Sequence, residues 1–448
     1  MIFLYSSQRK RQANIFAYTD NVDGETTYFP EAGVVVSALE YVSPIGALLV
    51  GYNFGSWQLW NVSAVNSGRG GSTWPISLEF SSKYTSEALP VVGFAFQEPE
   101  NDPRNFVYIW VLRGENDLDS AEEKCGLNSK ASISLQALAF QSKDESDAGV
   151  LYSGLVSCNC RFSCQLDNLK EEEIKGSLCL GANALPLPSL SGGHLGRKDV
   201  SEVEDGQVNL GLCSFLWEVL YKTNDGGGSE SEESRFRYFL GIFDLNAWYQ
   251  AQMPDNVEIY PTSQCSFFSV CALDEQLFDE DAAMEQRNKI QSNYLIDSRI
   301  DLSSISRYKS LSNAEQHFYP SSLAFNIVNL LDFGIVHANH LGLQRKVLLE
   351  LRSLGRDRLV DPTNLFELCV VAGLIENATD IEKCQENLSE QRNILLNIAL
   401  EHHLVDFMKG CLIHWFDGKA SLSFYQEKER ITKSHLKKFV KVCKKNLN

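Results

Sequence analysis

The sequence predicts a mainly β domain over residues 1–354, followed by an α-helical domain over residues 355–448. Two observations support this fold class. Between about residues 32 and 352, short apolar runs with a period of two alternate with turn-rich loops, which is the pattern of antiparallel strands joined in hairpins. After about residue 355, the apolar residues recur instead at the spacing of one face of a helix.

The β elements can be followed along the chain. Apolar residues at every second position from Val34 to Ala38 predict the first clear strand. Two more strands are predicted at residues 48–52 and 57–61, with a turn at Gly55 between them. Similar apolar runs predict further strands at residues 89–96, 106–112, 132–140, 149–157, 211–221, 236–245, 266–273 and 323–338.

The helical pattern begins gradually. Helical spacing is first visible over residues 343–351, and a helix start signal follows at Asp361-Pro362-Thr363. The face after that signal is apolar and consists of Leu365, Leu368, Cys369, Ala372 and Leu374. Further helices are predicted around residues 395–405 and at 432–447, where Thr432 is placed to cap the helix N-terminus.

One segment indicates which β fold is present. Residues 48–62 hold an apolar strand, a glycine-containing turn and a second strand that ends in Leu-Trp. Blades of WD-type β-propellers use this arrangement, and residues 239–245 are a looser copy of it. Because the loops vary in length, no clean period of 40–45 residues is visible. The pattern alone therefore favours a propeller and leaves a β-sandwich open.

Two segments point to a family. Residues 95–105 (Ala-Phe-Gln-Glu-Pro-Glu-Asn-Asp-Pro-Arg-Asn) and 248–255 (Trp-Tyr-Gln-Ala-Gln-Met-Pro-Asp) resemble segments in the propeller of the ELYS-like nucleoporins. Weaker similarity is found at residues 51–60, 318–322 and 370–374. The resemblance spans roughly residues 30–415.

The resemblance implies a seven-bladed WD-type propeller followed by an α-helical solenoid. It also implies a non-enzymatic scaffold and assembly factor of the nucleus, the nuclear envelope and the nuclear pore, which links chromatin or the envelope to the Y-shaped pore scaffold complex. Two departures stand out: the family's propeller begins before the point that matches Met1, so an incomplete propeller is expected here, and the family's tail with AT-hooks is absent. A vesicle-coat or other adaptor stays open as the alternative, because a fold alone does not fix function.

The two resembling segments are the candidate protein-docking loops. The first can be a structured turn or a docking surface, because Asn-Asp-Pro favours turns and loops often carry function. In the second, Trp248 is expected to fill the space between blades, whereas polar neighbours are expected to face a partner. The candidate docking residues are Gln97, Glu98, Glu100, Asn101, Asp102, Arg104, Asn105, Gln250, Gln252, Met253 and Asp255.

Charge is distributed unevenly along the chain. The formal net charge is −18, which argues against a protein that coats nucleic acid over its whole length. The predicted helix at 432–447 is nevertheless basic and is either a solvated helix face or a contact for nucleosomal DNA, an acidic partner or an anionic membrane surface. Its lysines are Lys437, Lys438, Lys441, Lys444 and Lys445.

Motifs for catalysis, cofactors and metals are missing from the sequence. It has no Gly-x-Ser-x-Gly elbow and no phosphate-binding loop, so we expect no enzyme activity, cofactor or small-molecule substrate. Cys158, Cys160 and Cys164 have the wrong spacing for structural zinc and are expected to be strand-edge thiols. The cluster of His402, His403, Cys411 and His414 is expected to belong to a helix surface and core. Residues 41–68 are uncharged, but glycine, proline and asparagine interrupt them, so no transmembrane segment is predicted.

Overall fold

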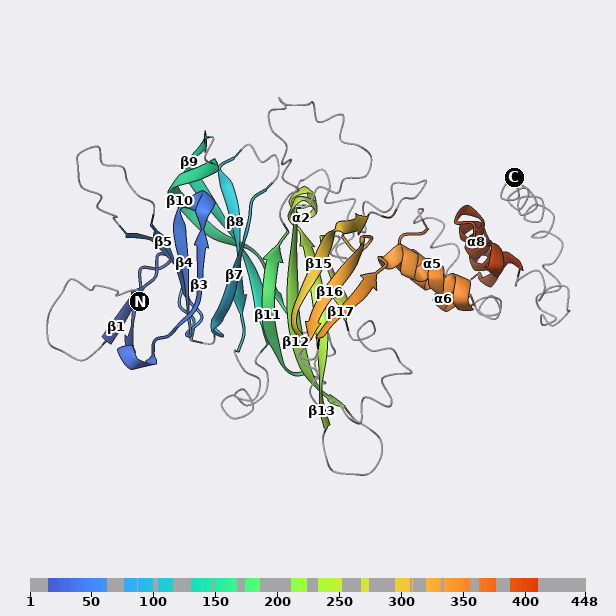
Figure 1. Cartoon of the computed structure of the whole chain (residues 1–448), viewed down its shortest axis with the longest axis horizontal. Coiled ribbons are helices and arrows are strands. Elements are labelled where there is room, and N and C mark those ends of the chain that lie inside the picture. The colour runs from blue at the N-terminus through green and yellow to red at the C-terminus, as the bar shows by residue number, and fades with distance from the viewer. Residues whose placement is uncertain are drawn as a thin grey trace.

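The computed structural model shows a row of β-sheets followed by helices (Figure 1). It describes residues 15–62, 76–86, 88–99, 104–115, 130–146, 149–166, 174–185, 211–223, 233–251, 267–273, 295–306, 308, 320–331, 334–354, 362–375 and 387–409. Within this part of the chain, no helix is both long and apolar enough to cross a membrane.

The strands form one hairpin and four antiparallel sheets, each of the four made of consecutive strands. The hairpin consists of β1 (Ile15–Thr19) and β2 (Thr26–Pro30). The first sheet consists of β3 (Val36–Val42), β4 (Ala47–Tyr52), β5 (Trp57–Asn61) and β6 (Ser77–Ser81). The second sheet consists of β7 (Val91–Gln97), β8 (Phe106–Arg113), β9 (Ser132–Ser146) and β10 (Gly149–Gln165).

The third and fourth sheets continue this order. The third consists of β11 (Ile174–Ala184), β12 (Leu212–Thr223), β13 (Glu233–Asp244) and β14 (Phe268–Ala272). The fourth has three strands, β15 (Leu295–Ser306), β16 (Ala324–Leu331) and β17 (Gly334–His340). The helices are α2 (Leu245–Ala251), α5 (Leu343–Leu354), α6 (Thr363–Val371) and α8 (Leu388–Glu401).

The sheets are arranged as propeller blades. The first strands of neighbouring sheets contact one another in order, β3 with β7, β7 with β11, and β11 with β15. Four separate meanders that meet at their first strands are the arrangement of β-propeller blades, whereas a sandwich has two sheets face to face. The prediction of a mainly β propeller fold is therefore confirmed over the sandwich.

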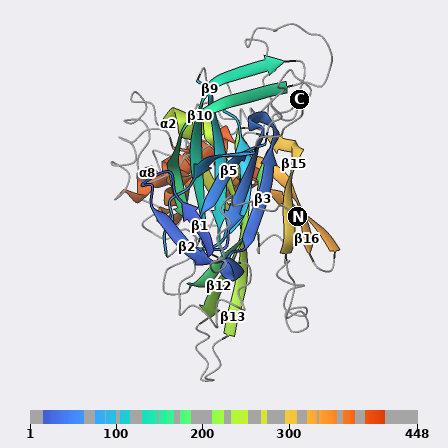
Figure 2. The ribbon, with the colours of Figure 1, turned by 90° about the vertical axis from the view of Figure 1, so that its left-hand side faces the viewer.

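Apolar cores lie between successive sheets. Because side chains alternate along a strand, β12 sends Phe215 and Trp217 into the core with the second sheet and Leu216 into the core with the fourth. A further core lies between the first and second sheets, around Leu59 and Val107. The β1–β2 hairpin packs on the other face of the first sheet and lies in front of it in Figure 2.

Each predicted β run in residues 89–338 contains at least one strand, and the run at 323–338 holds both β16 and β17. The sequence patterns missed β1, β2, β6, β11 and β15. Strand β11 is rich in glycine and small residues, and β15 carries many polar side chains, so neither has clean apolar alternation.

The change from strand to helix comes between β17 and α5, within the region where helical spacing first appears. Helix α6 begins at Thr363, directly after the predicted start signal. Helices α5, α6 and α8 share one apolar core around Leu351, Cys369 and Leu395. The predicted helix at 432–447 lies outside the described residues.

Candidate protein-docking site

The first predicted loop starts from a buried anchor. Gln97, the last residue of β7, is 5% exposed. Its side-chain oxygen accepts a hydrogen bond of 2.9 Å from the Trp110 indole N–H, and its amide nitrogen donates to the Gly211 carbonyl at 2.7 Å. The prediction that Gln97 faces a partner therefore needs correction, because its amide joins the second sheet to the third.

The second predicted loop begins as a helix. Asp244 ends β13, and its buried carboxylate accepts hydrogen bonds from the amides of Asn246 at 2.7 Å and Ala247 at 2.9 Å. This N-terminal cap explains why helix α2 starts at Leu245, where the sequence pattern predicts the end of a strand, followed by a loop at 248–255. The Leu245 amide donates a hydrogen bond of 2.8 Å to the Gly211 carbonyl, so Gln97 and the first residue of α2 donate to the same main-chain group.

Trp248 fills the space between sheets, as predicted. It is 6% exposed and meets Tyr108 of β8 edge to face, with ring centroids 6.1 Å apart. Phe243 of β13 contacts the same indole at 6.4 Å. The aromatic side chain thus holds α2 against the second sheet.

The exposed side chain of Arg104 joins the two predicted loops. Its guanidinium carbon lies 4.5 Å from the centroid of the Phe106 ring and 5.3 Å from that of Tyr249. The guanidinium also donates a hydrogen bond to the Tyr249 hydroxyl, across a sequence separation of 145 residues. The two segments that carry the family resemblance therefore meet at one end of the sheets, where Figure 1 shows α2 above the third sheet.

The β9–β10 hairpin supports the first loop from the other side. The Tyr152 hydroxyl donates to the Glu98 carboxylate, and the Lys143 ammonium lies 3.2 Å from the same carboxylate. Burial, together with the hydrogen bond to Glu98, raises the pKa of Tyr152 to about 12. The side-chain amide of Asn105 donates a hydrogen bond of 3.1 Å to the main-chain carbonyl of Gln141 on β9. Glu98 and Asn105 are thus held in place and half-exposed.

Several predicted site residues lie outside the described part of the chain. They are Glu100, Asn101, Asp102, Gln252, Met253, Asp255 and the lysines Lys437, Lys438, Lys441, Lys444 and Lys445. Gln250 lies in α2, and the structure does not describe its side chain. The sequence pattern did not single out Lys143, Tyr152 or Gly211 as part of this site, because nothing local indicates that they lie beside these loops.

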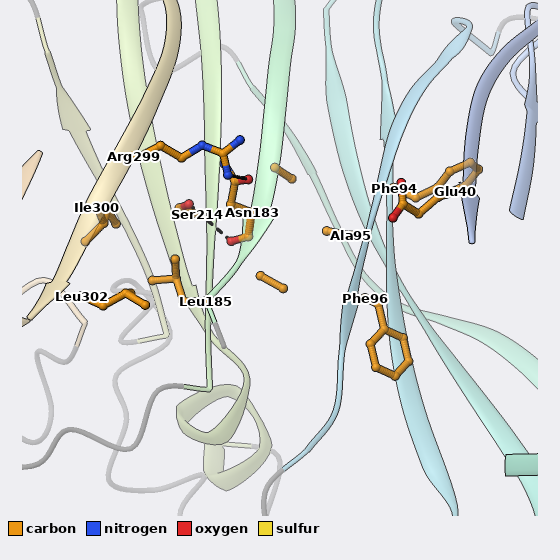
Figure 3. A pocket seen from close by; sticks show the side chains of 12 residues that line it. Glu40, Phe94, Ala95, Phe96, Asn183, Leu185, Ser214, Arg299, Ile300 and Leu302 are labelled. Atoms are coloured by element: carbon orange, nitrogen blue, oxygen red, sulfur yellow. Dashed lines mark hydrogen bonds between the residues drawn. The ribbon is translucent and has the colours of Figure 1, made fainter. Parts of the chain in front are cut away.

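A pocket elsewhere in the fold lies between the first strands of the four sheets and has a volume of 470 Å³. Figure 3 shows Arg299 beside Asn183 on one side and Glu40 on the other. Arg299 donates to Asn183 and forms an ion pair of 2.8 Å with Asp297, so its charge is already paired. Blades of a propeller are arranged around a central channel, so a pocket between the first strands corresponds to part of that channel.

The cysteines and histidines that the sequence analysis considered as metal ligands lie on β10 and beyond the end of α8. Cys158, Cys160 and Cys164 lie on β10, the edge strand of the second sheet, where strand-edge thiols are expected. Within the described residues, no three histidine, cysteine or acidic side chains are grouped to hold a metal. His402 is hydrogen-bonded to Tyr308, and burial lowers its pKa. Cys411 and His414 are not among the described residues.

Comparisons with known proteins agree with this geometry. Protein ELYS of Xenopus laevis is 28% identical over 393 residues, which cover 86% of this chain and 14% of the relative. Protein ELYS of Homo sapiens is 27% identical, covering 86% and 15%, and Protein mel-28 of Caenorhabditis elegans is 23% identical, covering 86% and 20%. The chain thus spans a fifth or less of the length of these relatives.

A family model described as the beta-propeller of ELYS nucleoporin matches residues 27–337, which is more than half of the chain. The matched region contains strands β3 to β16, the first part of β17, and both segments that meet at the Arg104–Tyr249 contact. The chain therefore belongs to the β-propeller family of the ELYS nucleoporin, and with it to the proteins of the nucleus and the nuclear pore.

Proposed function

We propose that this chain is a non-enzymatic scaffold and assembly factor that links chromatin or the nuclear envelope to the Y-shaped scaffold complex of the nuclear pore. The observation that carries the proposal is the contact between Arg104 and Tyr249, which joins the two family-like segments, residues 95–105 and 248–255, at one end of the propeller. Segments that lie far apart in sequence and come together on one surface are suited to bind one partner.

The chemistry of this end favours protein docking over catalysis. Arginine and tyrosine are enriched at the energetic centres of protein interfaces, and here Arg104 and Tyr249 lie side by side. The first loop also carries the ion pair of Glu98 with Lys143. Interfaces commonly combine aromatic contacts with such polar groups.

We also propose that the four sheets belong to a seven-bladed ring and that α5, α6 and α8 begin an α-helical solenoid. One cross-strand row on the first sheet, on the face away from the second sheet, supports the larger ring. Register places Tyr41, Leu48, Trp60 and Leu78 side by side, and Tyr41 and Leu78 are 55% and 43% exposed. Leu48 and Trp60 belong to the cluster that the β1–β2 hairpin forms on this face, and a further blade would cover the two exposed ends of the row. We propose in addition that the basic segment 432–447 contacts chromatin or an acidic partner.

Imaging and co-purification test the proposed function together. A fluorescently tagged chain is expected at the nuclear rim and on chromatin as the envelope re-forms after division. Pore scaffold subunits are expected to co-purify with it. A vesicular pattern throughout the cell cycle, with coat subunits in the purified material, would instead identify a coat adaptor and overturn the proposal.

A further inference from the structure

We propose that Arg104 is a positioning residue whose side chain holds the two docking loops in the arrangement that a partner recognises. The inference rests on the proposed docking function and concerns how the surface is kept ready for binding. We call the contact among Arg104, Phe106 and Tyr249 the clasp.

The loops have a rigid base beneath the clasp. Gln97 is bonded to both Trp110 and the Gly211 carbonyl, and the same carbonyl accepts the first amide of α2. An added Cβ at Gly211 would lie 2.7 Å from the Asn246 amide nitrogen, so the Asn246 side chain at the start of α2 would have to shift. The base therefore fixes where α2 starts and leaves its exposed side to be fixed by other contacts.

The clasp supplies that second point of attachment. The Arg104 guanidinium lies over two aromatic rings and is hydrogen-bonded to the hydroxyl of one of them. A guanidinium is planar and can stack on a ring while it donates hydrogen bonds, whereas the compact ammonium of lysine cannot do both in this way. The contact needs this side chain rather than a positive charge alone.

Exposure separates the clasp from the core. Arg104 is exposed and Tyr249 is half-buried, whereas Gln97 and Trp248 are buried. Replacing Arg104 should thus leave the global stability nearly unchanged while α2 and the first loop move independently. A partner that binds both loops must then order them on binding, which weakens its apparent affinity.

Binding to the purified Y-shaped pore scaffold complex tests the clasp. We expect Arg104→Ala, Arg104→Lys and Tyr249→Ala each to weaken binding roughly tenfold, about 1.4 kcal/mol. The two Arg104 variants should keep the unfolding midpoint of the wild type, whereas Tyr249→Ala should lower it, because this half-buried ring packs against the core that contains Trp248. The double variant Arg104→Ala/Tyr249→Ala should lose little more than either single change, because both remove one contact. Arg161→Ala, at an exposed arginine on β10, is the matched control and should bind like the wild type.

Hydrogen exchange of the free protein gives an independent readout. We expect faster exchange of the α2 amides in the Arg104 and Tyr249 variants than in the wild type and in Arg161→Ala. Unchanged hydrogen exchange of α2 in the variants would overturn the clasp, whether or not the scaffold complex binds. Failure of the wild-type protein to bind the scaffold complex would overturn the proposed function, and it would leave the exchange test of the clasp valid. Wild-type scaffold binding with equal affinity of the clasp variants would overturn the clasp and leave the docking function intact.

Discussion

Replacing Gln97 by leucine tests the base of the docking site. The change replaces the amide by an apolar side chain of similar size, and it leaves the fully buried indole N–H of Trp110 without its acceptor. A buried donor left unsatisfied costs about 1–3 kcal/mol. The Gly211 carbonyl also loses a donor but keeps the Leu245 amide at 2.8 Å. We therefore expect Gln97→Leu to lower the free energy of unfolding by about 2 kcal/mol.

A double-mutant cycle with Trp110→Phe makes the test specific. The phenylalanine variant removes the indole donor and should lose stability itself, because the ring packs against Phe215 and Phe243 at centroid distances of 4.7 Å. With both changes present no donor is orphaned, so the double variant should be about 1–2 kcal/mol more stable than the sum of the single losses predicts.

Urea unfolding followed by circular dichroism measures all four proteins. Gln141→Leu, the same substitution at an exposed glutamine on β9, should change the unfolding free energy by less than about 0.5 kcal/mol. Losses from Gln97→Leu and Trp110→Phe that add within about 0.5 kcal/mol would refute the reasoning that one hydrogen bond couples them.

Three further predictions concern stability. Gly55 has a φ of +81°, and a Cβ added there would lie 2.4 Å from the Cβ of Ala88. Gly55→Ala should therefore lower the free energy of unfolding, measured in urea, by at least about 2 kcal/mol. At the control position Gly33, no atom lies within 4 Å of an added Cβ, so Gly33→Ala should cost less than about 1 kcal/mol. Burial raises the pKa of Glu218 to about 7, although a hydrogen bond with Tyr238 lowers this pKa in part. The folded state therefore keeps the proton of Glu218 to a higher pH than the unfolded state does. Stability should therefore fall as the pH rises from about 4.5 to above 7, and Glu218→Gln should show less of this fall; equal pH profiles would contradict it. Tyr18 is buried, and its hydroxyl donates a hydrogen bond of 2.7 Å to the main-chain carbonyl of Ser82, directly after β6. Tyr18→Phe should therefore lower the free energy of unfolding by about 1 kcal/mol and speed hydrogen exchange in the β1–β2 hairpin. Exchange protection of the hairpin equal to that of the wild type would count against this prediction.

Sequence patterns predicted the strands that have clear apolar alternation and missed those that do not. Strands β8 and β12 carry long apolar runs because both of their faces are buried between sheets. Strand β15 was missed because polar side chains occupy alternate positions along it, at Asp297, Arg299 and Asp301. Local propensity is a weak guide where neighbouring sheets decide burial.

The candidate docking site was only partly predictable. The sequence singled out both segments, but nothing local shows that Arg104 and Tyr249 touch across 145 residues. The same limit explains why Gln97 was wrongly predicted to face a partner. A polar side chain at the end of a strand is expected on the surface unless its two buried hydrogen-bond partners are known. Helix α2 was missed because its cap, Asp244, ends an apolar strand and gives no separate helix signal.

Site-specific cross-linking to the Y-shaped pore scaffold complex tests the central claim that the two loops form one docking surface. A photo-reactive residue would be placed at position 250 on α2, at position 98 in the first loop, or at position 161 on β10 as the control. We predict cross-links from positions 250 and 98 to the same scaffold subunit and none from position 161. Cross-links from 161 alone, or from 250 and 98 to unrelated proteins, would contradict it.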